Sequence, residues 1–192
     1  MIYRPGTGKT VTIVEAIRQL VAADSRNRIY ACAPSNSAAD LIAERLTDLG
    51  HDGLFRLNAH SRGKGTIQKE LLPFSFLDGD MFSVPPVETL KKYRVIVSTC
   101  FSASIPYCVG LPQGHFSHIF IDEAGQGTET EIMVPIKTMA GIDTNVILSG
   151  DMKQLGPIVR SPIARELGLS RSYLDRLTSY PVYDEKGEQG KT

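Results

Sequence analysis

The spacing of apolar residues predicts two helices near the beginning of the chain. From Val11 to Val21, apolar side chains recur every three or four positions with polar residues between them, which is the spacing of one helix face. The same spacing returns from Ala38 to Leu49, and Gly50 then stands where glycine commonly ends a helix. We therefore expect two amphipathic helices, each with one face on a hydrophobic core.

Four short apolar runs predict the strands of a sheet. Each run is continuously apolar rather than alternating, which is typical of parallel strands covered by helices on both faces. The runs are Arg28–Ala33, Tyr93–Ser98, His118–Ile121 and Asn145–Ser149. Residues 129–140, between the last two runs, predict a crossover helix. This alternation of strands and helices predicts an α/β fold with a mainly parallel sheet.

One domain is expected over residues 1–180. The apolar pattern weakens between residues 51 and 92, where turn residues and isolated aromatics follow a possible strand at 54–57. We interpret 51–92 as an irregular insertion over the core, with Phe74, Phe76 and Phe82 packed on it rather than stacked on bases. Short helical pieces are expected within 161–180, and residues 181–192 are expected to form a flexible C-terminal tail.

The charge balance excludes proteins that bind polyanions by net charge alone. The 192 residues contain 21 Lys and Arg and 21 Asp and Glu, which gives a formal net charge of +0. A local basic groove is compatible with this balance. The apolar runs are far shorter than the roughly 18 residues that a membrane helix needs, so no membrane association is expected.

The cysteines and histidines do not form a recognisable metal or disulfide pattern. Cys32, Cys100 and Cys108 are odd in number, widely spaced and without a CxxC pair. This argues against a disulfide framework and a zinc site, and favours free thiols in a reducing cytoplasm. His115 and His118 flank the start of a predicted strand without further ligands, so we expect them to be structural.

A glycine-rich turn before the first helix has the parts of a phosphate cradle. It consists of Pro5, Gly6, Thr7, Gly8, Lys9 and Thr10. Glycines let backbone N–H groups turn toward an anion, and the helix N-terminus adds the positive end of its dipole. Lys9 can reach the β and γ phosphates, and the Thr10 hydroxyl can bind Mg²⁺. The alternative is a solvated turn that only precedes an amphipathic helix.

The beginning of this segment departs from the pattern of phosphate-binding loops. Tyr3 stands where the pattern has glycine, and only Met1 and Ile2 precede Arg4. A loop of this kind follows a buried strand, so we expect the first strand of the sheet to be truncated. Loss of that strand is expected to leave backbone groups of its neighbours unpaired.

Two further polar turns follow predicted strands. Asp122 and Glu123 come directly after the run that ends at Ile121. Asp122 is expected to hold Mg²⁺ through water and Glu123 to polarise the attacking water, although two acids that cap a helix give the same pattern. Gln154 lies in the turn after the run 145–149, where its amide can sense a γ-phosphate. Because ligands of open parallel sheets bind at the carboxyl ends of strands, the three turns together predict a nucleotide hydrolase that uses Mg²⁺.

In the order and spacing of these segments the chain resembles superfamily 1 RNA helicases. The resemblance is strongest to the Armitage and Moloney leukaemia virus 10-like branch, which is related to the nonsense-mediated-decay helicases. The similar segments are Pro5–Thr10 for motif I, Ala33–Asp40 for motif Ia, Ser98–Cys100 for motif Ic, Asp122–Gln126 for motif II and Gly150–Pro157 for motif III. A weaker similarity runs from Arg56 to Arg62.

The resemblance implies a RecA-like P-loop NTPase domain of three layers, the first of two in such helicases. It implies catalytic roles for Lys9, Asp122, Glu123 and Gln154. It implies ATP contacts from motif I and from Gln126, Gly150 and Asp151, and Mg²⁺ binding by Thr10 and Asp122. It also implies contacts with the nucleic-acid backbone from Pro34, Ser35, Asn36 and Thr99. Such hydroxyl and amide groups can position a strand without reading its sequence, and an ordinary helix N-cap explains Ser35 or Asn36 as well.

The resemblance also implies partners and a limit on activity. An ATP-dependent helicase of this kind translocates on single-stranded RNA or DNA, together with RNA-silencing or decay factors. Its second RecA-like domain supplies arginine fingers, worth on the order of 10³–10⁵ in rate in related enzymes, and is expected to be missing from this chain. The isolated chain is therefore expected to have little ATPase activity.

Other classes remain as alternatives. One is a catalytically inactive nucleotide-binding fragment or interaction module. A small kinase and a GTPase are further alternatives. The sequence has no Asn-Lys-x-Asp string for reading guanine, and the segment 150–157 together with motif Ia argues against a kinase.

Overall fold

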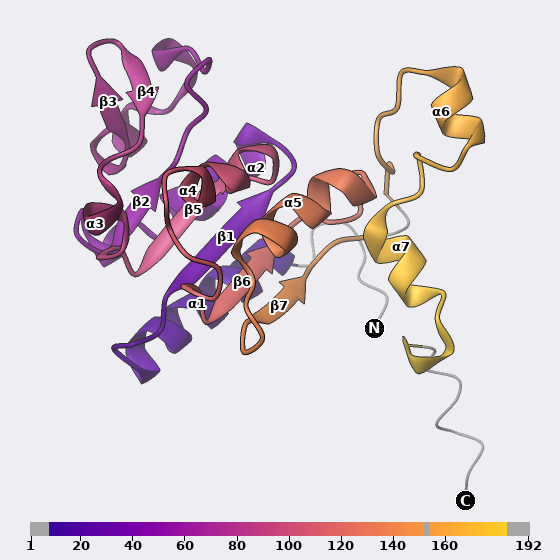
Figure 1. Ribbon diagram of the computed structural model, residues 1–192, viewed down its shortest axis with the longest axis horizontal. Helices are drawn as coiled ribbons and strands as arrows, with labels where there is room; N and C mark the ends of the chain where they lie inside the picture. Colours follow the sequence, from indigo (N-terminus) through magenta and orange to yellow (C-terminus); the bar gives the residue numbers. More distant parts are fainter. Residues whose placement is uncertain (1–7, 152–153, 184–192) are drawn as a thin grey trace, which may run out of the picture.

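Five parallel strands form the central sheet. The computed structural model describes residues 8–151 and 154–183 (Figure 1). The strands are β1 (Ile29–Ala33), β2 (Leu54–Arg56), β5 (Val95–Thr99), β6 (His118–Ile121) and β7 (Asn145–Leu148). Their order across the sheet is β2-β5-β1-β6-β7, and each neighbouring pair is parallel. The four strands predicted from apolar runs are confirmed, with small shifts at their ends.

The central strand β1 is buried on both faces, which explains why its sequence is apolar throughout. Successive side chains of a strand point to opposite faces. Ile29, Ala31 and Ala33 pack into one hydrophobic cluster, and Tyr30 and Cys32 pack into a second. All five are 0% exposed. The sheet is therefore the middle one of three layers, which confirms the predicted architecture.

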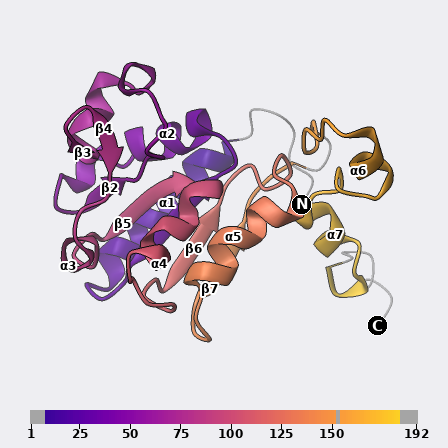
Figure 2. The ribbon, with the colours of Figure 1, turned by 45° about the horizontal axis from the view of Figure 1, so that its top comes forward.

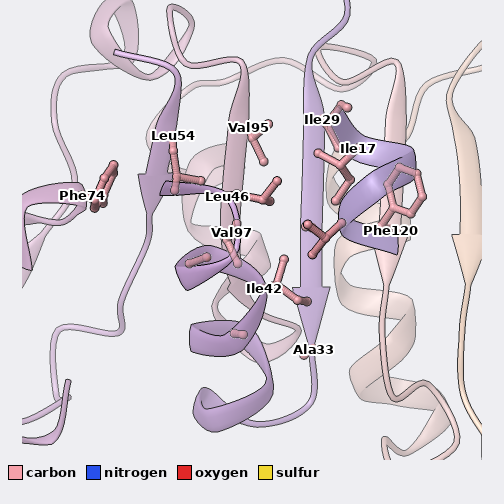
Figure 3. Packing of buried hydrophobic residues seen from close by; sticks show 14 of the residues in the cluster. Ile17, Ile29, Ala33, Ile42, Leu46, Leu54, Phe74, Val95, Val97 and Phe120 are labelled. Carbon is pink, nitrogen blue, oxygen red and sulfur yellow. The ribbon is translucent and has the colours of Figure 1, made fainter. Parts of the chain in front are cut away.

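Helices cover the two faces of the sheet. They are α1 (Lys9–Ala23) and α2 (Asn36–Glu44) on one face and α5 (Glu129–Met139) on the other. Figure 3 shows side chains of α1 and α2 directed at β1 and β5. Figure 2 shows α5 and the short α4 (Ile105–Cys108) on the opposite side of the sheet from α1. The crossover helix predicted for 129–140 is thus confirmed.

Local sequence explains where α2 and α5 begin. The Ser35 hydroxyl accepts a hydrogen bond from the Ala38 amide at 3.2 Å, as an N-cap residue does. Thr128 and Glu131 form a capping box, in which each side chain accepts a bond from the other residue's backbone amide. In both helices, side chains that are close in sequence therefore accept hydrogen bonds from amides that lack a partner within the helix.

The second predicted helix is shorter than expected. It ends as an α-helix at Glu44, and a separate 3₁₀ turn spans Thr47–Leu49. The helix tightens because the Leu46 amide donates to the carbonyl of Ala43, three residues back, at 3.0 Å. Gly50 then adopts a φ of 72°, a left-handed value that favours glycine, and it ends the 3₁₀ turn rather than the α-helix.

One strand lies inside the range predicted to be irregular. β2 pairs with β5 from Leu54 opposite Val95 to Arg56 opposite Val97. This strand falls within the possible strand that the sequence indicated at 54–57. Three residues carry too little periodicity to be distinguished from a loop, and only the pairing with β5 defines the strand.

Short elements make up the rest of this segment. They are 3₁₀ turns at Lys64–Thr66 and Lys69–Phe74, the antiparallel hairpin of β3 (Phe76–Asp78) and β4 (Met81–Ser83), and α3 (Val87–Leu90). In Figure 1 the hairpin lies beside β2, far from β7. Phe74 and Phe82 are 8% and 1% exposed and pack into the core cluster, as predicted. Phe76 is 39% exposed on the hairpin.

The C-terminal part lies at the β7 end of the sheet. Its helices are α6 (Pro162–Glu166) and α7 (Tyr173–Thr178), which agree with the short pieces expected there (Figure 1). Arg176 of α7 forms two hydrogen bonds of 2.7 Å with the Glu129 carboxylate at the start of α5. Residues 181–183, predicted to belong to a flexible tail, form a 3₁₀ turn. The rest of that predicted tail lies outside the described residues.

Within the described residues, no helix is long and apolar enough to cross a membrane. Cys32, Cys100 and Cys108 are free thiols, the first two buried. In the same part of the chain no group of three or more His, Cys, Asp and Glu side chains is placed to hold a metal.

Candidate functional site

Strand ends place several polar turns at one edge of the sheet. The Asp122 amide, after β6, donates to the Cys32 carbonyl of β1 at 2.9 Å. The Ser149 amide, after β7, donates to the Ile121 carbonyl of β6 at 2.9 Å. The turns after β1, β6 and β7 are thus fixed side by side at the carboxyl ends of the strands, where ligands of open parallel sheets bind.

The first turn of α1 lies at the same edge. Gly8 caps this helix with a φ of 80°, a conformation that glycine adopts without steric penalty. Because a glycine cap offers no side-chain acceptor, the first amides of the helix remain available to an anion. Lys9 and Thr10 follow, and both are partly buried. Three residues of the predicted cradle lie outside the described ranges, namely Pro5, Gly6 and Thr7.

Thr10 and Asp122 are in direct contact. The Thr10 hydroxyl donates to Asp122 Oδ2 at 2.8 Å. The other carboxylate oxygen of Asp122 accepts from the Glu123 amide at 2.9 Å and from the Ser149 hydroxyl at 3.1 Å. Asp122 is 2% exposed, so these donors compensate for burial of its charge. A hydroxyl and a carboxylate side by side are the hard oxygen donors that Mg²⁺ accepts together with phosphate oxygens, so the residues present fit this ion.

Ser149 is a residue that sequence reasoning missed. Its position in the turn after β7 was a usable signal, because that turn was expected at the site. Its contact with Asp122 depends on the adjacency of β6 and β7 and is not visible in the sequence.

Glu123 has an unusual backbone and an altered acidity. Its φ is 52°, a left-handed value that costs a non-glycine residue of order 1–3 kcal/mol. Burial and the neighbouring Asp122 raise the pKa of its carboxyl, while the charge of Lys9 opposes the shift. Gln126 donates to the Glu123 carboxylate at 3.1 Å. Glu123 is thus held close to Lys9 and Asp122 with a carboxylate that is a stronger base than an ordinary glutamate.

The turn after β7 packs backbone to backbone against the turn after β6. The Ala124 amide donates to the Ser149 carbonyl at 2.7 Å. A Cβ atom added at Gly150 would lie 2.7 Å from the Gly125 nitrogen. Gln154 is held in this turn by a hydrogen bond of 3.2 Å to the Asp151 carboxylate. The predicted residues of motifs II and III are therefore brought together.

We expect Gly150→Ala to destabilise the protein. The added methyl group meets backbone atoms of the neighbouring turn, and such overpacking typically costs about 1–3 kcal/mol. Thermal unfolding measures the loss. Gly65→Ala is the control, because a Cβ at Gly65 meets nothing within 4 Å. Equal melting temperatures for the two variants would contradict the close packing of these turns.

The residues predicted to contact nucleic acid lie after β1 and β5. Ser35 and Asn36 are exposed at the start of α2, and the N-cap bond of Ser35 leaves its hydroxyl at the surface. Thr99 is partly buried, and its hydroxyl bonds to the Ser102 hydroxyl at 3.1 Å. Pro34 joins β1 to α2. The structure thus places all four at the edge that carries Asp122.

A cleft of about 920 Å³ connects Pro34 and Ser35, after β1, with Gln126 and Gln154 in the turns after β6 and β7. It is lined by Pro34, Ser35, Gln126, Glu131, Gln154, Leu155, Gly156 and Ile158. Segments similar to motifs Ia, II and III therefore share one hollow.

A buried cluster of charged side chains contacts the first turn of α2. Asp40 lies between Arg56 and Arg62, with nitrogen-to-oxygen distances of 2.8 and 2.6 Å. Arg56 is 0% exposed and also donates to the Asn36 side chain at 3.2 Å. Asn58 accepts from Arg62 at 2.7 Å. Apart from the weak similarity of the segment from Arg56 to Arg62, nothing in the residue pattern indicates this cluster.

The two arginines of this cluster lower the pKa of Asp40. Burial alone raises the pKa of Asp40, but the hydrogen bonds and charges of Arg62 and Arg56 outweigh it, and the net pKa is lowered. Asp40 is therefore ionised at neutral pH, and its one carboxylate is shared by two guanidinium groups.

His115 and His118 lie away from this edge. His118 begins β6, at the opposite end of the strand from Asp122, and bonds to the Ser117 hydroxyl at 3.0 Å. His115 packs edge-on against Phe116. Burial lowers the pKa of both imidazoles, so they are neutral at pH 7.

Comparison of the sequence with known proteins identifies relatives among helicases. "Putative helicase mov-10-B.1" of Danio rerio is 44% identical over 190 residues, which are 97% of this chain and 19% of the relative. "RNA helicase Mov10l1" of Homo sapiens is 41% identical and covers 93% of this chain and 14% of its own length. "Probable RNA helicase armi" of Drosophila melanogaster is 36% identical, with coverages of 93% and 17%. The chain thus spans less than a fifth of these relatives.

Solved structures share the fold. The UvsW helicase from bacteriophage T4 superposes with a TM-score of 0.52 over 88% of this chain and 50% of its own, at 14% identity. The S. cerevisiae dbp5 structure gives 0.51 over 85% and 37%, at 17% identity. The family described as "AAA domain" matches residues 1–66 and 85–162, more than half of the chain. The chain therefore belongs to the AAA domain family.

Proposed function

We propose that this chain is the ATP-binding and ATP-hydrolysing core of an RNA helicase that translocates on single-stranded nucleic acid. The observation that carries the proposal is the contact of Thr10, in the first turn of α1, with Asp122 at the end of β6. It joins a helix N-terminus suited to phosphate with a buried carboxylate suited to Mg²⁺. Asp122 is 2% exposed and accepts a hydrogen bond from Thr10 of α1. A surface acid that merely caps a helix would have neither property.

In this proposal the residues of the chain divide the work at the γ-phosphate. Lys9 and the amides of α1 bind the phosphates, and Thr10 and Asp122 would hold Mg²⁺, which neutralises charge on the β and γ oxygens when bound. Glu123 accepts a proton from the attacking water, for which its raised pKa suits it. Gln154, beside Asp151 on the next turn, is placed to respond to the γ-phosphate. Gln126, Gly150 and Asp151 complete the nucleotide contacts.

Nucleic acid is proposed to bind along Pro34, Ser35, Asn36 and Thr99. These groups are uncharged and suit contacts with phosphates that do not depend on sequence. The cleft that joins Pro34 and Ser35 to Gln126 and Gln154 supports a coupling between nucleotide state and strand binding. A second RecA-like domain, RNA-silencing or decay factors as partners, and a cytoplasmic location are part of the proposal. The relatives that are named RNA helicases support RNA as the nucleic acid. The free thiols agree with a reducing compartment.

Nucleotide binding by the chain itself tests this proposal. A fluorescent ATP analogue is titrated in the presence and absence of Mg²⁺. We expect Lys9→Ala to weaken Mg²⁺-dependent binding at least tenfold, because the variant removes a cation from the phosphate site. Lys92→Ala is the matched control, since Lys92 is exposed before β5, at the other edge of the sheet. Equal affinities for both variants, or no Mg²⁺ dependence, would contradict the proposed nucleotide site.

A further inference from the structure

One aromatic side chain stands exposed beside the proposed strand path. Phe101 is 78% exposed, more than any other aromatic residue that the structure describes. It follows Thr99 after a single residue. Single exposed apolar residues are common on protein surfaces, so exposure alone carries no argument. The position of Phe101 and the rigidity of its backbone are more informative.

Backbone bonding fixes where Phe101 lies. The Cys100 amide donates to the Ala33 carbonyl at 2.8 Å. Pro34 and Phe101 each directly follow one member of that pair, so both stand at the carboxyl edge of β1 and β5. Phe101 is therefore next to residues that the proposed function assigns to the nucleic-acid backbone.

The backbone beneath the ring is well anchored. Phe101 opens a 3₁₀ turn that ends at Ser104. Ser102 and Ala103 of this turn are 3% and 0% exposed, and the Ser102 amide donates to the Thr99 hydroxyl at 3.3 Å. A rigid buried turn with one ring in solvent loses little conformational entropy when the ring meets a flat ligand.

The electrostatics of the chain favour a stacking contact. The formal net charge is +0, and the proposed backbone contacts carry no cation. Proteins that bind single strands combine charge with aromatic platforms on which bases stack. Where the proposed phosphate contacts carry no cation, binding depends more heavily on the second contribution. Of the other aromatics that the sequence suggested for this role, Phe74 and Phe82 are buried, and Phe76 lies on the β3–β4 hairpin beside β2.

We propose that Phe101 is a base-stacking site for single-stranded nucleic acid, beside the backbone contacts of Thr99 and Asn36. This inference rests on the proposed function, because it assumes that a strand runs along this edge. The ring would add affinity without reading sequence, since every base has a π face, and it would not distinguish RNA from DNA.

The absence of tryptophan from the sequence allows a direct test. Phe101→Trp places one indole at the site, and its fluorescence is followed while oligo-adenylate or oligo-uridylate RNA is added at low salt. We expect quenching by both, stronger for adenine. Phe76→Trp on the hairpin is the control and should not be quenched. In anisotropy titrations, Phe101→Ala should bind labelled RNA at least fivefold more weakly than the wild type, the lower end of the range for one stacked base.

Two further readouts separate stacking from other causes. The dependence of affinity on salt should keep its slope in Phe101→Ala, because no phosphate contact is lost. Phe101→Tyr should restore the affinity, and melting temperatures should not change, since the side chain is 78% exposed. RNA binding with an unquenched indole and an unchanged alanine variant would overturn the inference and leave the nucleic-acid proposal standing. No RNA binding by the wild type would overturn both.

Discussion

Replacing Glu123 by glutamine is expected to lower ATP turnover by about 10²–10⁴, the usual contribution of a general base. Glutamine keeps the shape of the side chain but cannot accept a proton from water. Nucleotide affinity should remain, because Thr10 and Asp122 are bonded to each other independently of the Glu123 side chain. The measurement is steady-state ATP hydrolysis with single-stranded RNA, in a protein that carries this domain with a second RecA-like domain, together with binding of an ATP analogue.

The pH dependence of ATP turnover offers a second test of Glu123. Because burial and Asp122 raise the pKa of this carboxyl, it takes up a proton at a higher pH than an ordinary glutamate. Turnover should therefore decline on acidification before exposed carboxylates titrate, and the decline should be absent from the residual rate of the glutamine variant. Glu70→Gln, at an exposed position in the insertion, is the control. Unchanged turnover in Glu123→Gln would remove Glu123 from the role of base.

Replacing Asp40 by alanine should cause the largest loss of stability. The change leaves the guanidinium groups of Arg56 and Arg62 without their shared carboxylate, and these side chains are 0% and 6% exposed. Removing one partner of a buried ion pair typically costs about 3–5 kcal/mol, a large part of an ordinary free energy of unfolding of about 5–15 kcal/mol. Denaturant unfolding of the chain measures this loss.

A surface pair supplies the control for Asp40. Arg18 and Asp48 are 2.9 Å apart, with side chains 39% and 57% exposed, so Asp48→Ala should change stability by less than about 1 kcal/mol. The pKa of Asp40 is lowered in the folded protein. Its contribution is therefore present above the ordinary pKa of aspartate and is lost as the pH falls through the folded value. Wild type and Asp40→Ala should converge in acid; a constant difference would contradict the ion pair as the cause.

Sequence reasoning located elements with strong local patterns and missed those defined by distant contacts. The continuous apolar runs predicted β1, β5, β6 and β7, because burial on both faces selects such composition. It indicated β2 only as a possible strand at 54–57, because three residues carry little pattern and the pairing with β5 defines the strand. The same limit applies to the site: adjacent polar turns indicated Asp122 and Glu123, whereas the bond from Ser149 to Asp122 depends on how two strands lie together.

Backbone conformation was also beyond the sequence. Nothing in the residue types around Glu123 indicates a φ of 52°. The surrounding turn imposes this value, because the Glu123 amide bonds to Asp122 and the adjacent turns pack without room for change. Strain of this kind commonly lies at functional sites, where the structure around a residue determines its conformation.

The order of strands has a consequence for how the chain is made. Ile29 of β1 pairs with Val95 on one side and with His118 on the other, so its neighbours are synthesised long after it. Contacts this distant in sequence are slow to form, and until they form the apolar β1 segment has no partner on either edge. Nascent chains that end before β5 should therefore be prone to association, and slower growth at lower temperature should raise the yield of folded protein.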